Sequence, residues 1–203
     1  MRVAHYAGDA TIAVAEADPV PPGPGEVQIA VAFTGICGTD LHIRHGSMDA
    51  RVRVPVVLGH EMSGRITAVG AEVSRWRVGD PVTVMPLRWC GSWWSSRTRT
   101  AGCSPRSWEW QCWTRVAVGI HPMPQMVDMQ RVFLRELSLL GARVYERSDF
   151  ERAVRLIAEG TVPAGRLVSR VEPLGSAAEA FTALESGDGV MKVLADCRGD
   201  GGR

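Results

Sequence analysis

The most informative stretch of the chain is GICGTDLH at residues 35–42, which is followed by GHE at residues 59–61. Together they supply a thiolate (Cys37), an imidazole (His60) and a carboxylate (Glu61), ligand types that hold zinc in catalytic sites. Thr39 and His42 add a hydroxyl and a second imidazole within five residues of the cysteine, as a path for moving a proton requires. These five side chains are a candidate catalytic metal site.

The spacing leaves alternatives open at each of these positions. An isolated cysteine is usually a small buried apolar residue, an isolated histidine is usually structural, and Thr39 could equally cap a turn. In an extended segment His60 and Glu61 would point to opposite faces. Both reach one zinc only if the chain turns there, for which Gly59 gives freedom; otherwise Glu61 acts from outside the ligand shell. The remaining histidines have no such companions and are expected at the surface or in loops: His5, His45 and His121.

Composition describes an ordinary globular chain and excludes several partners. It has 203 residues, 45% of them apolar, and a net charge of +1, which gives no electrostatic reason to expect nucleic acid or an anionic membrane. No apolar run approaches the about 18 residues of a transmembrane helix, and the N-terminus lacks the apolar core of a signal peptide. We therefore expect a cytoplasmic protein. Its five cysteines are an odd number, which argues against a disulfide framework.

Hydrophobic periodicity divides the chain into a β-rich part and a helical part. Apolar residues alternate over 27–33, a second strand is expected over 62–69, and turn residues at 78–80 precede another short strand. The first 86 residues are thus typical of a small barrel or sandwich. Capping patterns predict helices that begin at Ser148 and Ser176 and end at Gly160 and Gly187, before a final strand over 190–195.

Residues 89–115 match neither pattern. They hold six of the seven tryptophans among Ser, Arg, Thr and Cys, without helical or strand period. One interpretation is a basic-aromatic platform for single-stranded nucleic acid. The other is a stretch without coherent structure, produced by a frame-shift or mis-splicing in a GC-rich gene, which the 22 arginines and single lysine would fit. Reading codons 90–113 in all frames tests this second hypothesis.

Several motifs in order resemble the zinc-dependent medium-chain alcohol dehydrogenases, nearest to the butanediol, sorbitol and threonine dehydrogenase branch. They are PGPGEV (22–27), GICGTDLH (35–42), VLGHEMSG (57–64) and VGDPV (78–82). The resemblance implies that Cys37 and His60 are zinc ligands and that Glu61 is a ligand or its close neighbour. It further implies that Thr39 passes the proton of the alcohol outward and that His42 continues the relay.

The same resemblance implies a mixed β/α fold, a GroES-like catalytic domain with returning C-terminal helices and strand, and only a remnant of a Rossmann domain. It resumes near VAVGI (116–120) and runs to about Cys197. The expected divisions are a GroES-like zinc catalytic domain (1–91), an aberrant irregular segment (92–115), the Rossmann remnant (116–140) and the C-terminal segment of the catalytic domain (141–203).

Two departures from the family pattern limit this expectation. A structural zinc on four cysteines would need, counting from Cys90, ligands at Trp93, Ser96 and Ser104, so only one catalytic zinc is expected. No Gly-x-Gly-x-x-Gly turn between a strand and a helix occurs, so no NAD- or NADP-binding residue can be assigned.

The expected function follows from the family resemblance and from the missing nucleotide-binding motif. We expect a homologue of enzymes that oxidise a small secondary alcohol or polyol by transferring hydride to NAD or NADP, with the nucleotide-binding domain largely missing and activity impaired. The alternatives are a non-catalytic zinc-binding GroES-like module and a defective gene product. A homo-oligomer is compatible with the resemblance, whereas nucleic acid and membrane are not expected as partners.

Overall fold

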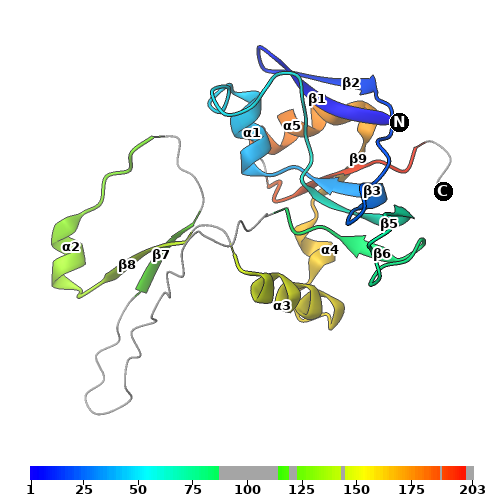
Figure 1. The fold of residues 1–203 in the computed structure, drawn as a ribbon. Coiled ribbons are helices and arrows are strands. Elements are labelled where there is room, and N and C mark those ends of the chain that lie inside the picture. The colour runs from blue at the N-terminus through cyan, green and yellow to red at the C-terminus, as the bar shows by residue number, and fades with distance from the viewer. Residues whose placement is uncertain (87–113, 119–122, 143–144, 188, 200–203) are drawn as a thin grey trace. The chain divides into compact units, whose positions relative to one another are not determined.

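The computed structural model describes residues 1–86, 114–118, 123–142, 145–187 and 189–199. It divides into two units, one formed by Met1–Pro86 with Arg147–Arg203 and the other by Leu87–Glu146 (Figure 1). The tryptophan-rich segment lies outside the described residues as far as residue 113. The first unit therefore joins two stretches that are far apart in the sequence.

A small antiparallel sheet opens the first unit. β1 (Arg2–Gly8) and β2 (Thr11–Glu16) form a hairpin, whose turn residues Asp9 and Ala10 have φ of 49° and 58°. β4 (Val56–Val57) pairs with the other edge of β1, giving the order β2-β1-β4. Tyr6 of β1 is 1% exposed and belongs to the core of this unit.

The second sheet of this unit interleaves early and late strands. Its order is β6-β5-β3-β10-β9. The expected strands at 27–33 and 62–69 correspond to β3 and β5, which pair antiparallel over most of their length. β10 lies antiparallel to β3 and parallel to β9, so a late strand sits beside the strand that leads to Cys37. The bounds are β3 (Val27–Gly35), β5 (Glu61–Val69), β6 (Pro81–Thr83), β9 (Arg170–Pro173) and β10 (Val193–Asp196).

Both expected helices are present in this unit. The first, α3 (Arg147–Ala158), begins one residue before Ser148, and Gly160 follows its end with φ +74°. The second, α5 (Ala177–Ser186), ends at Gly187, the left-handed cap. Ser176 is its N-cap by position but makes no side-chain capping bond, because a 3-10 turn, η1 (Leu174–Ser176), runs into the helix. Two short helices were not expected: α1 (Gly38–Arg44) and α4 (Ala164–Leu167).

The core of this unit joins its N-terminal and C-terminal parts. Ile36, Ala180, Phe181 and Val193 form one buried cluster, in which no member is more than 5% exposed. Ile36 directly precedes Cys37, whereas the other three come from α5 and β10. The predicted mixed fold, a β-rich domain completed by returning helices and a strand, is confirmed.

The other unit contains a strand–helix–strand arrangement. β7 (Thr114–Val118) and β8 (Ser138–Ala142) pair in parallel, and α2 (Met129–Leu134) lies between them in the sequence. Parallel neighbours need such a crossover connection, which is the repeating element of nucleotide-binding sheets. No helix among the described residues is long and apolar enough to span a lipid bilayer.

Candidate metal centre

Cys37 takes the N-cap position of α1, at the point where β3 ends. Its sulfur accepts a hydrogen bond from the backbone N–H of Thr39 at 3.2 Å. In return, the carboxylate of Asp40 accepts the N–H of Cys37 at 2.9 Å. This reciprocal capping box fixes the direction in which the sulfur points.

Gly59 turns the chain so that His60 and Glu61 serve one site. Its φ is +93°, which a residue with a side chain rarely adopts. A Cβ at this position would also lie 2.7 Å from the hydroxyl oxygen of Thr34. The turn resolves the geometric question posed by the sequence, because Glu61 starts β5 while His60 precedes the strand.

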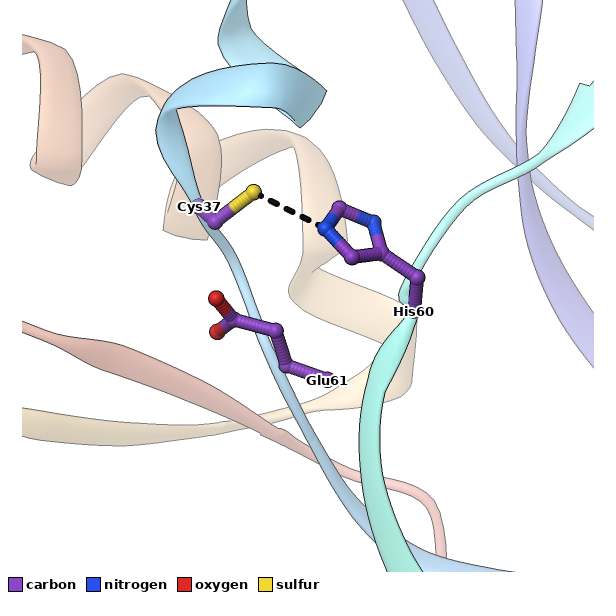
Figure 2. Close-up of side chains that lie close together, drawn as sticks. All are labelled: Cys37, His60 and Glu61. Carbon is purple, nitrogen blue, oxygen red and sulfur yellow. Dashed lines mark hydrogen bonds between the residues drawn. The ribbon is translucent and has the colours of Figure 1, made fainter. Parts of the chain in front are cut away.

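The three predicted ligands lie together (Figure 2). Cys37 Sγ is 3.2 Å from His60 Nε2. One ligand atom of each of Cys37, His60 and Glu61 lies within 4.8 Å of the others. A tetrahedral zinc with ligands at about 2.0–2.3 Å would hold those atoms about 3.3–3.8 Å apart, so only small movements separate this arrangement from a metal site.

Burial governs the protonation of the cysteine. The pKa of the Cys37 thiol is raised, first by burial and then by the nearby Asp40 charge, against the smaller effects of hydrogen bonds. A metal takes the thiolate as its ligand, so binding here would release a proton.

Asp40 is a member of the site that the sequence analysis missed. It is 1% exposed, and Oδ1 lies 3.5 Å from His60 Nδ1. That distance is too long for a firm hydrogen bond, and Oδ1 has no hydrogen-bond partner among the described residues. A carboxylate facing Nδ1 favours the tautomer whose Nε2 lone pair is free for a metal. The signal was available in the sequence, because Cys37-x-x-Asp40 has the spacing of a capping box.

The predicted proton-transfer residues both lie on α1. Thr39 and His42 are half-buried and three residues apart, which places them on neighbouring positions of one helix face. Of the other histidines, His5 lies in β1, and His45 caps the end of α1 with Nε2 2.9 Å from Glu185. His121 lies outside the described residues.

A lysine also reaches the site from the far end of the chain. Lys192, just before β10, donates from Nζ to Glu61 Oε2 and, at 2.9 Å, to the carbonyl oxygen of Ile36. The Glu61 side chain is 39% exposed and that of Lys192 is 29% exposed. Glu61 thus already has a cationic partner.

We expect Asp40→Ala to weaken metal binding by about 10–100-fold, the usual cost of losing the carboxylate behind a histidine ligand. It should also lower the free energy of unfolding by about 1–2 kcal/mol, since the cap on Cys37 N–H is lost. Cobalt titration and urea denaturation measure the two effects.

Asp40→Asn separates the two roles of this residue. Asparagine has a single side-chain oxygen, so it can accept the Cys37 N–H but then turns its amide toward His60. Stability should be largely kept while metal affinity falls. If Asp40→Ala bound metal with wild-type affinity, the proposed role of Asp40 in supporting His60 would be contradicted.

The fold and this cluster define a GroES-like catalytic domain of the alcohol dehydrogenase type. Residues 23–122 match the family model described as "Alcohol dehydrogenase GroES-like domain". In this respect the chain is similar to the zinc-dependent medium-chain alcohol dehydrogenases, as the motifs of residues 22–82 indicated.

Named relatives agree with this assignment. The chain is 34% identical over 184 residues to 2-dehydro-3-deoxy-L-galactonate 5-dehydrogenase of Pseudoalteromonas atlantica, an alignment that covers 84% of this chain and 53% of that protein. It is 45% identical over 87 residues to sorbitol dehydrogenase of Gallus gallus, covering 41% of this chain and 24% of that enzyme. The chain thus spans about half the length, or less, of these curated relatives.

Solved structures show the same fold. The crystal structure of 2R,3R-butanediol dehydrogenase from Bacillus subtilis aligns with a TM-score of 0.78 at 16% identity, covering 96% of this chain and 99% of that chain. At this identity the likeness concerns the fold alone.

Proposed function

We propose that the chain forms the zinc-binding catalytic half of an alcohol or polyol dehydrogenase and that, as it stands, its dehydrogenase activity is impaired. The observation that carries the proposal is the convergence of Cys37, His60 and Glu61 from two separate segments. The expected substrate class is a small secondary alcohol or polyol, and the expected hydride acceptor is NAD or NADP.

The donor set suits one zinc ion. Cys37 and His60 supply the soft and borderline ligands that zinc prefers, and Glu61 supplies an oxygen ligand or stays beside the metal. The buried Asp40 carboxylate, with an oxygen turned to the histidine, is the partner that such ligands usually have. When bound, zinc stabilises the negative charge that develops on an alcohol oxygen.

We assign proton transfer to two residues of α1. We expect the Thr39 hydroxyl to accept the proton of the alcohol and His42, one turn further along, to relay it toward solvent. The bonds around Cys37 anchor the first turn of α1, which keeps the Thr39 backbone fixed relative to the sulfur.

We expect dehydrogenase activity to be impaired because the chain lacks the motif that binds the nicotinamide cofactor. No Gly-x-Gly-x-x-Gly sequence occurs in the 203 residues. A dinucleotide needs those glycines for close approach of its phosphates. Without them the nicotinamide has no defined place beside the zinc.

Two measurements on the purified protein test the proposal. We expect one zinc per chain by elemental analysis and no alcohol-dependent formation of NADH with secondary alcohols or polyols. A metal-free protein after zinc supplementation would refute the site, whereas measurable turnover would refute the impairment.

The missing glycine fingerprint also supports a second candidate, a non-catalytic zinc-binding module. Calorimetric titration with NAD separates the two, because only an enzyme needs the cofactor. The third reading, a defective gene product, predicts low solubility from uncovered apolar surface. A monodisperse sample that melts cooperatively would contradict that reading.

A further inference from the structure

Lys192 is the single lysine among the 203 residues, and its ammonium group lies at the metal site. The other basic side chains, apart from the histidines, are 22 arginines. Nζ is held by two acceptors, Glu61 Oε2 and the carbonyl oxygen of Ile36, the residue next to Cys37. The position of the ammonium group is therefore fixed by the same backbone that carries the sulfur ligand.

Gly35 leaves room in the sheet for the Glu61 and Lys192 side chains. Gly35 of β3 lies opposite Glu61 of β5 on one side and Leu194 of β10 on the other. A Cβ on Gly35 would lie 2.6 Å from Glu61 Oε2 and 2.8 Å from Lys192 Cε. The Glu61–Lys192 pair thus passes directly over Gly35, in space that any other residue would fill.

We infer that Lys192 is an internal competitor of the metal for Glu61, an inference that rests on the proposed zinc site. The ammonium neutralises the one carboxylate among the three candidate ligands. A divalent cation must either take Glu61 from Lys192 or bind with an uncompensated positive charge close by. Both alternatives lower the affinity of the site for the metal. The first breaks the Glu61–Lys192 ion pair, and the second places two positive charges close together in a half-buried site.

Competition from Lys192 has a structural consequence for the ligand set. Cys37 and His60 form the part of the site that is free to bind, and Glu61 joins only when Lys192 withdraws. Lys192 is a positioning residue, anchored through its own backbone: its carbonyl oxygen accepts the N–H of Ser169 at 2.8 Å. The packing of β9 against β10 holds the Lys192 backbone in place and thereby influences metal affinity.

Cobalt affinity of Lys192→Met tests the inference, with the absorption spectrum of Co²⁺ reporting its ligands. We expect Lys192→Met to bind at least about tenfold more tightly than wild type, with stronger visible bands as Glu61 joins the shell. The matched control is Arg170→Met, which removes the same charge from an exposed side chain on the neighbouring strand β9 and should leave affinity within about twofold. In a Glu61→Gln background the gain from Lys192→Met should shrink.

A chemical test removes the charge of Lys192 without replacing the residue. Acetylation of amines in the wild type modifies Lys192 and the N-terminus, and it should tighten cobalt binding as Lys192→Met does. In Lys192→Met, which serves as the control, the same treatment modifies only the N-terminal amine and should leave cobalt affinity unchanged.

The outcomes separate the two proposals. Equal or weaker cobalt binding by Lys192→Met, with wild type binding normally, overturns the role of Lys192 and leaves the zinc site standing. Absence of binding in both proteins refutes the zinc site and this inference with it.

Discussion

Replacing Cys37 and His60 together by alanine should reduce zinc and cobalt affinity by more than about 100-fold. Loss of a partner that only supports a ligand already costs about 10–100-fold, and this variant removes two of the proposed direct ligands. The remaining Glu61 carboxylate is paired with Lys192, so it holds little metal by itself. Competition titration against a chelator of known affinity measures the change.

A matched control uses the same two residue types elsewhere in the first unit. Cys197 is a half-buried free thiol, and His5 lies in β1. The double variant Cys197→Ala/His5→Ala should bind metal as the wild type does. Equal metal content in the Cys37/His60 variant and in this control would refute the ligand assignment.

Phe181→Ala should lower the free energy of unfolding of the first unit by about 3–5 kcal/mol. Phe181 is 3% exposed and belongs to the cluster with Ile36 and Val193. Removing the ring leaves a cavity next to Ile36 from the N-terminal part of the first unit and Val193 from its C-terminal part. Urea denaturation followed by circular dichroism measures the loss.

Met191→Ala is the control for that experiment. It removes a side chain of comparable length from a position that is 66% exposed, two residues before Val193. We expect a change below about 0.5 kcal/mol. A loss below about 1 kcal/mol for Phe181→Ala would contradict a shared core between residues 1–86 and 147–203.

The sequence predicted elements whose signals are local and strong. Alternating apolar residues marked β3, and left-handed glycines after α3 and α5 marked the helix ends because few other residues adopt that conformation. The short helix α1 was missed because its cap is a cysteine, an unusual capping residue, and because a seven-residue helix offers little periodicity.

For the site, the sequence predicted which residues meet but not what surrounds them. Motif order pointed to Cys37, His60 and Glu61, which the structure brings together. Asp40 was passed over because no helix was expected over residues 38–44, so its capping role beside Cys37 was not foreseen. Lys192 is 131 residues from Glu61, and only the pairing of β10 with β3 reveals their contact.

The central place of β10 has a consequence for the order of events during synthesis. β3, β5 and the residues of the candidate metal site leave the ribosome early, but their sheet lacks an inner strand until residues 193–196 emerge. Until then Ile36 N–H has no Val193 carbonyl to bond, and the Glu61 carboxylate has no Lys192 ammonium to pair with. The nascent chain therefore passes through a stage in which it carries the three candidate ligands without the lysine that pairs with Glu61.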